Sequence, residues 1–288
     1  MKWTPGNTSQ DIEDRRGEGG GSRFGGGRGL GVGGFVVLLI LSVVFKQDLF
    51  SLLGQGGLPS GGQAAPSAEA GPVAQSPEEE KRVKFVSFVL DSAQAFWQQE
   101  FAQKGAQYRH AKLVLFRDGV QSGCGNASAA TGPFYCPADE KVYIDLGFYD
   151  ELDRRFGAPG DFAQAYVLAH EIGHHVQKLL GIEDKVRRLQ QSDPGEANPT
   201  QVKMELQADC LAGVWGKATE QMGILQAGDV EEGIGAAAAV GDDRIQKAAT
   251  GSVHPESFTH GSSEERVRWF SRGFKSGRIE DCDTFGSR

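Results

Sequence analysis

The segment HEIGHHVQKLLG, residues 170–181, decides the expected fold, and it holds three of the six histidines of the chain. Residues four positions apart project from one face of a helix, so His170 and His174 can bind one metal ion. Glu171 lies one helical step away, where a general base for a metal-bound water belongs. His175 points away from that face. Unpaired polar residues are costly to bury in an apolar helix, so the segment predicts a metal site rather than a purely structural helix.

A second segment, ELQADC at residues 205–210, supplies a third ligand. Glu205 is predicted to bind the ion. Asp209, one turn later on the same face, is predicted to accept a hydrogen bond from the free nitrogen of a ligating histidine and to fix the orientation of its ring. Asp209 or His254 could instead be the third ligand. Two imidazoles and a carboxylate with an open fourth position suit Zn²⁺, at one ion per chain.

This ligand set predicts hydrolysis. Glu171 would take a proton from water, the resulting hydroxide would attack a polarised carbonyl, and Glu171 would pass the proton to the leaving amine. His260 is the candidate for holding the oxyanion, with Tyr143 and His254 behind it. The alternative is that His260 merely caps the final helix.

Helix start signals divide the rest of the chain. Ser76 with Pro77 and Glu79 predicts a helix that runs to about Gln103. Asp161 is the predicted cap of the helix that carries the histidines. Further helices are expected from residues 198–199 and from residue 262, and one or two lie between them, with a break near residue 241.

Two short apolar or alternating runs, AKLVLF at 111–116 and KVYIDL at 141–146, predict strands. The expected fold is therefore α+β, mostly helical with a small sheet. If KVYIDL is an exposed edge strand beside the metal helix, an extended peptide could pair with it. An internal strand is the alternative.

The four cysteines contain no C-x-x-C spacing, so a zinc ribbon is not indicated. Cys124 and Cys136 flank a segment that is typical of a loop and form a natural local pair, which leaves Cys210 with Cys282. Two disulfides require an oxidising compartment, and free buried cysteines are the alternative.

The chain before the domain has three predicted parts. Residues 1–29 are polar and Gly-rich and predict a disordered arm; residues 30–53 predict a transmembrane anchor; and residues 54–75 predict a flexible linker before a domain at 76–288. A signal peptide and a core helix fit the apolar run less well. Basic residues are more numerous before the run than after it, so the N-terminus is expected in the cytoplasm and the domain outside.

Composition excludes one class of partner. The formal charge of −8 and the sequence pI of about 5.3 argue against nucleic-acid binding, which needs clustered basic residues. A peptide or protein substrate and the membrane are the expected partners.

The motifs HEIGHH, ELQADCLAGVW and THGSSEERVRWF, together with EDRRG near the N-terminus and CDTF near the C-terminus, resemble the bacterial neutral zinc metallopeptidase family. The resemblance covers essentially the whole chain apart from the linker. It implies a zincin-like domain with His170, His174 and Glu205 as zinc ligands and Glu171 as the catalyst. It also implies a single-pass protein of the bacterial inner membrane, with its domain in the periplasm or outside the cell.

Three functions are consistent with these features. The first is a membrane-anchored zinc peptidase, expected to be an endopeptidase. The second is a catalytically idle, metal-stabilised binding module of the cell envelope. The third is a zinc amidase that acts on cell-wall peptides. The intact Glu171 favours an enzyme, because a structural zinc site has no use for a base.

Overall fold

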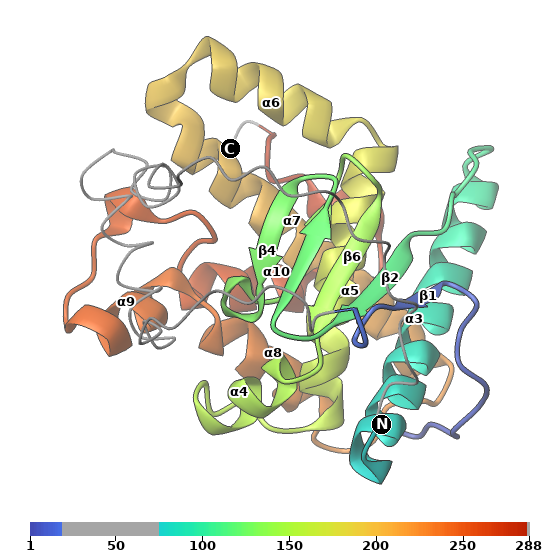
Figure 1. Ribbon diagram of the computed structural model, residues 1–288. Coiled ribbons are helices and arrows are strands. Elements are labelled where there is room, and N and C mark those ends of the chain that lie inside the picture. Colours follow the sequence, from blue (N-terminus) through green and yellow to red (C-terminus); the bar gives the residue numbers. More distant parts are fainter. Residues whose placement is uncertain (19–74, 287–288) are drawn as a thin grey trace, which may run out of the picture.

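The computed structural model describes residues 1–18 and 75–286, and in these residues a small sheet packs against a group of helices (Figure 1). The predicted α+β class is confirmed. The strands are β1 (Ile12–Asp14), β2 (Lys112–Phe116), β3 (Gly119–Ser122), β4 (Gly125–Ser128), β5 (Phe134–Cys136) and β6 (Lys141–Asp145). The α-helices are α3 (Pro77–Gln103), α4 (Phe148–Arg154), α5 (Asp161–Leu179), α6 (Ile182–Ser192), α7 (Ala197–Gln221), α8 (Asp229–Ala239), α9 (Asp242–Thr250) and α10 (Ser263–Ser276).

The main sheet has the strand order β1-β2-β6-β5. The first three strands are parallel and β5 runs antiparallel to β6, while β3 and β4 form a separate hairpin. The KVYIDL strand, β6, is therefore internal, which is the second of the two alternatives that the sequence left open. The reason is that β5, inside the predicted Cys124–Cys136 loop, pairs with it from Phe134 opposite Tyr143 to Cys136 opposite Lys141.

Most helices begin close to the capping residues that the sequence predicts. The Ser76 side chain caps α3, and Ser262 and Glu265 form a capping box at the start of α10. The segment 229–250 forms two helices that break at residues 240–241, as expected. Asp161 does not cap α5, because Gly160 occupies the cap position with φ 113° and the Asp161 carboxylate instead accepts hydrogen bonds from the α-amino group of Met1.

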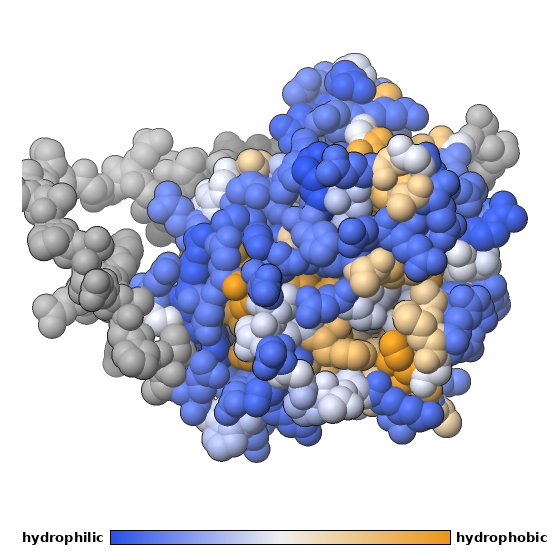
Figure 2. All heavy atoms as spheres, turned by 90° about the vertical axis from the view of Figure 1, so that its right-hand side faces the viewer, coloured by the Kyte–Doolittle hydropathy of each residue, from blue (hydrophilic) through white to orange (hydrophobic). Residues whose placement is uncertain are grey.

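The core lies between the sheet and the helices. Val89, Leu90 and Trp97 on the inner face of α3 are almost fully buried, as are Leu113 and Ile144 of the sheet. Figure 2 shows the side of the molecule that lies at the right of Figure 1, where α3 runs. Hydrophilic residues cover most of this face and hydrophobic ones show through near its centre.

Helices α7 and α10 approach each other closely because two glycines lie at their crossing. A Cβ on Gly273 would lie 1.9 Å from the Cys210 carbonyl oxygen, and one on Gly213 would lie 2.1 Å from the Phe270 carbonyl oxygen. Only residues without a side chain fit between these backbones. This contact sets the distance between α7, which carries Glu205 and Asp209, and α10.

Both predicted disulfides are present. Cys124 pairs with Cys136 across a Cα separation of 5.8 Å, and Cys210 pairs with Cys282 across 5.5 Å. The second bond joins the middle of α7 to a chain segment 72 residues away. It fixes the C-terminal end of the domain against the helix that carries Glu205.

The prediction of a disordered arm over residues 1–29 is wrong for residues 1–18. Residues 12–14 form β1, which adds to the sheet beside β2, and Met1, Ser9 and Arg16 are buried. The composition of this segment predicts that it cannot form a hydrophobic core by itself. It is ordered because strand β2 offers a free edge for pairing and because charged residues of the domain pair with its side chains.

The predicted anchor at 30–53 and the predicted linker at 54–75, up to residue 74, lie outside the described residues. Within residues 1–18 and 75–286, no helix combines the length and the hydropathy that a membrane crossing needs.

Substitution of Gly273 tests the close helix crossing. We expect Gly273→Ala to lower the free energy of unfolding by about 1–3 kcal/mol or more, because the new methyl group must push α7 and α10 apart. The matched control is Gly235→Ala on α8, where a Cβ would meet no atom within 4 Å. The control should be neutral or stabilising by up to about 1 kcal/mol. Urea unfolding of the two variants checks this, and equal stabilities would contradict the crossing.

Candidate metal centre

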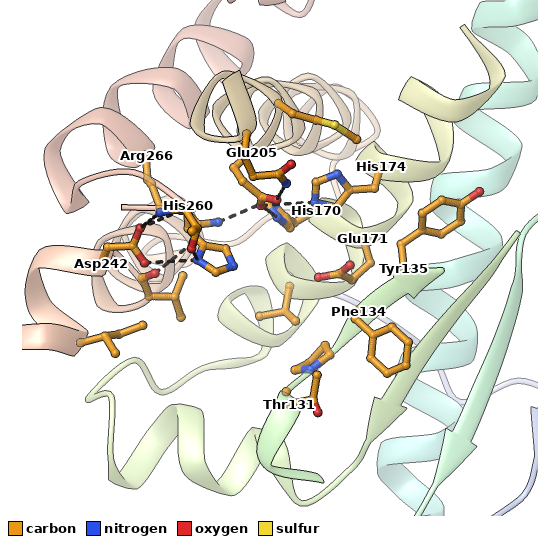
Figure 3. Close-up of a pocket in the computed structure, with 18 of the residues that line it drawn as sticks. Thr131, Phe134, Tyr135, His170, Glu171, His174, Glu205, Asp242, His260 and Arg266 are labelled. Carbon is orange, nitrogen blue, oxygen red and sulfur yellow. Dashed lines mark hydrogen bonds and ion pairs between the residues drawn. The ribbon is translucent and has the colours of Figure 1, made fainter. Parts of the chain in front are cut away.

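Three predicted ligands meet in one place. His170 and His174, one turn apart on α5, and Glu205 on α7 each offer a ligand atom, and these atoms all lie within 4.8 Å of one another. The Nε2 atoms of His170 and His174 lie 3.2 Å and 3.4 Å from one Glu205 carboxylate oxygen. Tetrahedral zinc with bonds of about 2.0–2.2 Å places neighbouring donors about 3.3–3.5 Å apart. The donor types and their spacing therefore fit Zn²⁺, and the three side chains line one pocket (Figure 3).

Asp209 orients the first histidine, as predicted. Its carboxylate is fully buried and accepts a hydrogen bond from Nδ1 of His170 at 2.9 Å, which leaves Nε2 for the metal. The same carboxylate accepts hydrogen bonds from the Tyr166 hydroxyl at 2.5 Å and from two nitrogens of Arg266 at 2.8 Å and 2.9 Å. A buried carboxylate is stable when it is paired in this way.

Gln177 orients the second histidine, and the sequence-based prediction missed it. The side-chain oxygen of Gln177 lies 2.9 Å from Nδ1 of His174. Its nitrogen donates to the Met204 carbonyl at 2.7 Å and to the Gln207 side chain at 3.0 Å, and Gln207 in turn donates to the Cys282 carbonyl at 2.9 Å. The spacing was available as a signal, because Gln177 stands one turn after His174 on the same helix.

Arg266 was also missed, although it lies in the quoted THGSSEERVRWF motif. The Arg266 side chain is 4% exposed and donates to Asp209, to the Tyr166 hydroxyl and to the Val240 carbonyl. An arginine near the start of an amphipathic helix is usually a surface residue, so sequence alone gives no reason to bury it.

The charges of the site are strongly coupled. Burial by itself raises the pKa of Asp209, but Arg266 and His170 outweigh it and lower that pKa to about 2. Burial alone would lower the pKa of His170, yet Asp209 and Glu205 raise it to about 10. Asp209 and Glu205 thus favour the protonated form of His170, and a metal ion that binds at Nε2 would displace that proton.

Glu171 lines the same pocket as the ligands, on the neighbouring face of α5 (Figure 3). The pocket has a volume of about 850 Å³ and is bounded on one side by β5, through Phe134 and Tyr135. Glu171 is 7% exposed. A carboxylate beside the ligands, open only to the pocket, has the position of a general base.

His260 lies across the pocket from Glu171 (Figure 3), and its side chain remains 52% exposed. Asp242, which the sequence-based prediction missed, holds it. The Asp242 carboxylate lies 3.2 Å from Nδ1 of His260 and accepts the backbone N–H groups of residues 259, 260 and 261 at 2.7, 2.7 and 3.1 Å. Partial burial opposes the charged imidazole, but the hydrogen bond to Asp242 and the nearby Glu205 carboxylate outweigh it and raise the pKa of His260. His260 is thus a fixed hydrogen-bond donor that faces the pocket.

The other residues that the sequence suggested lie elsewhere. The Tyr143 hydroxyl donates to Asp139 at 2.6 Å, away from the ligands, and Cys210 is in a disulfide. His254 lies on the pocket wall beside Glu256, and its side chain is 58% exposed. His175 is buried between the Tyr135 hydroxyl and the Arg109 carbonyl, so its role is structural.

A comparison of the sequence with known protein families agrees with the chemistry of this site. Residues 1–285 match the family described as "Putative neutral zinc metallopeptidase". The chain belongs to this family. The match begins at residue 1, so the N-terminal segment that carries β1 is part of the family pattern.

Similar proteins occur in Escherichia coli and in Mycobacterium. The chain is 48% identical over 292 residues to the "Uncharacterized protein YpfJ" of Escherichia coli (strain K12), with 99% of each chain covered. It is 45% identical over 191 residues to the "Uncharacterized protein Mb2605" of Mycobacterium bovis, which covers 62% of this chain and 64% of that one. The same figures hold for the "Uncharacterized protein Rv2575" of Mycobacterium tuberculosis. No solved structure matches the chain.

The role of Gln177 can be tested through metal affinity. We expect Gln177→Leu to weaken zinc binding by about 10- to 100-fold, because His174 loses the partner that fixes its ring. Competition with a chromophoric chelator measures this. Gln226→Leu, at an exposed position outside the site, is the control and should bind zinc as the wild type does. If the two variants bind zinc with equal affinity, Gln177 does not contribute to the metal site.

Proposed function

We propose that the protein is a zinc-dependent peptidase with Glu171 as its general base. The observation that carries this proposal is the convergence of His170, His174 and Glu205 around one point beside Glu171, in a pocket large enough for a peptide. Family membership supports the same chemistry. An open pocket beside the ligands favours catalysis over an idle structural site, which usually closes its fourth position.

Zinc bound by these three ligands would lower the pKa of a water molecule and polarise the scissile carbonyl. The Glu171 carboxylate would accept the proton of the attacking water and then deliver it to the leaving amine. Its position within the pocket restricts solvent access, which helps the carboxylate to exchange its proton with the substrate rather than with bulk water.

His260 is proposed to donate a hydrogen bond to the oxygen that becomes negatively charged. Asp242 fixes Nδ1 of the ring at 3.2 Å, so Nε2 is the donor that can face the substrate. The raised pKa of His260 favours the protonated ring that such a donor needs. His260 would therefore stabilise the tetrahedral state.

The substrate is proposed to bind in an extended conformation along β5. This strand is the outer strand of the sheet on the pocket side, and Phe134 and Tyr135 line the pocket. An added peptide strand would form backbone hydrogen bonds with it. Pairing with this strand edge requires several consecutive backbone amides, which a polypeptide has and a small amide lacks. The strand edge therefore favours peptide substrates and supports endopeptidase action.

We further propose that residues 30–53 attach the protein to the bacterial inner membrane, with the domain in the periplasm or outside the cell. The support is the length and hydropathy of the run and the two disulfides, which persist in oxidising compartments. A cytoplasmic N-terminus, as expected from the basic residues before the run, would place residues 1–18 across the membrane from the domain that they contact.

Substitution of Glu171 is the direct test of the mechanism. Glu171→Gln should keep one zinc ion per chain and lose about 10²- to 10⁴-fold in the rate of casein hydrolysis, because the amide cannot accept the proton. Metal content and peptide release are measured on the full chain. Glu231→Gln on the exposed face of α8 is the matched control and should keep both.

Two outcomes of this test oppose the proposal. Hydrolysis by the zinc-loaded Glu171→Gln protein at the wild-type rate would remove Glu171 from catalysis. If the wild type releases peptides from peptidoglycan but not from casein, the amidase function takes the place of the peptidase function.

His260→Ala should lower kcat by about 10²- to 10³-fold with little change in zinc content, because the oxyanion loses its donor. His254→Ala tests the alternative donor on the pocket wall. A large loss in His254→Ala together with a small one in His260→Ala would transfer the role to His254. Initial rates with one peptide substrate and metal analysis of the same samples decide between them.

A further inference from the structure

The first eighteen residues are built into the domain. Strand β1 lies parallel to β2, with Ile12 opposite Leu113 and Asp14 opposite Leu115. Backbone hydrogen bonds of 2.8 Å flank the pair, from Leu113 to the Asp11 carbonyl and from Arg15 to the Leu115 carbonyl. Without this segment, β2 would be an open sheet edge in the described fold, and exposed edges are prone to aggregation.

Charged pairs hold the segment along its length. The Asp11 carboxylate contacts the Lys112 ammonium and the His110 ring, each at 2.7 Å, and Glu13 contacts the Lys141 ammonium at 2.7 Å. The Arg16 side chain, 1% exposed, pairs with Asp14 at 2.5 Å and with Glu79 of α3 at 2.9 Å. Asp14 lies in the segment itself, so the Glu79 carboxylate is the charge that the rest of the domain supplies to this buried arginine.

The beginning of the segment reaches the helices. The Trp3 ring packs edge-on against Phe85 of α3, with 5.2 Å between centroids. The backbone N–H of Lys2 donates to the Ile224 carbonyl at 2.7 Å. The α-amino group of Met1 lies 2.6 Å from Asp161, the first residue of α5, and 3.2 Å from Asp229, the first residue of α8. The segment thus connects the sheet with the start of the metal helix.

The described residues on either side of the segment 19–74, which contains the apolar run, lie close together. The ion pair between Arg16 and Glu79 joins a residue just before this segment to a residue just after it. The chain therefore leaves the described fold and returns to it at one place. A membrane that is crossed once would separate these residues.

We propose that residues 1–18 are an integral part of the domain and lie on the same side of the membrane as the pocket, so the apolar run makes no net crossing. The run of 24 residues would measure about 36 Å as a helix. A hydrocarbon core of about 30 Å allows it one crossing but not two. This topology does not depend on the peptidase activity.

The first experiment tests docking in the full chain. Arg16→Met removes the buried charge, and Lys2→Met removes an exposed charge from the same segment. We expect the melting temperature of Arg16→Met to fall by roughly 6–20 °C. We expect that of Lys2→Met to stay within about 2 °C of the wild type. If the segment does not dock, both substitutions will be silent, and that result overturns the proposal.

The second experiment tests sidedness and does not need Arg16→Met to fold. All four native cysteines are in disulfides, so a cysteine placed at exposed Asn7 or at exposed Gln226 of the domain is the sole free thiol. A membrane-impermeant maleimide is added to intact cells and to lysed cells. Equal labelling of Asn7→Cys and Gln226→Cys in intact cells is expected.

The remaining labelling outcomes separate the two proposals. Labelling of Gln226→Cys in intact cells, with Asn7→Cys labelled only after lysis, would overturn the shared location and restore a single crossing. Labelling of both only after lysis would support the shared location. It would contradict the proposed periplasmic or external position of the domain.

Discussion

The geometry of the candidate metal centre depends on the buried carboxylate of Asp209. It carries a charge in a fully buried place, and such a charge is stable only with full compensation. The compensation comes from His170 and Tyr166 on α5 and from Arg266 on α10. Three helices must therefore keep fixed distances from one another. The glycine contact between α7 and α10 makes the short distance to Arg266 attainable.

The contacts of Asp209 and Gln177 also determine which ring nitrogen of each histidine is left for the metal. Each imidazole uses Nδ1 for a protein partner, Asp209 in one case and Gln177 in the other. Both Nε2 atoms are left to converge on the Glu205 carboxylate. The donors are thus oriented by the fold rather than by the ion. A site arranged in this way loses little conformational freedom when it binds zinc.

The sequence predicts those parts of the fold that local rules determine. Histidines four residues apart, a serine before a helix and a cysteine pair around a short loop each depend on neighbours in the chain. The contacts of Asp242 and Arg266 depend on residues farther away in the sequence, and no local rule addresses them. The internal position of β6 depends on β5, a strand of three residues that the sequence analysis took for part of a loop. The N-terminal segment was missed for a related reason. Its average composition indicates disorder, whereas a few residues such as Asp11 and Arg16 dock onto partners formed by later parts of the chain. The EDRRG motif, part of the family resemblance, was the available signal.

The position of the N-terminal segment limits what it can do. It occupies the β1 edge of the sheet, and the pocket lies against β5 at the opposite edge. The segment therefore does not occupy the strand edge proposed for the substrate, and inhibition by occlusion is not its function. The Arg16–Glu79 ion pair joins this segment to the start of α3. The described residues on either side of 19–74 therefore lie close together, and the segment pairs at the edge of the sheet remote from β5, which leaves the proposed substrate strand uncovered by it.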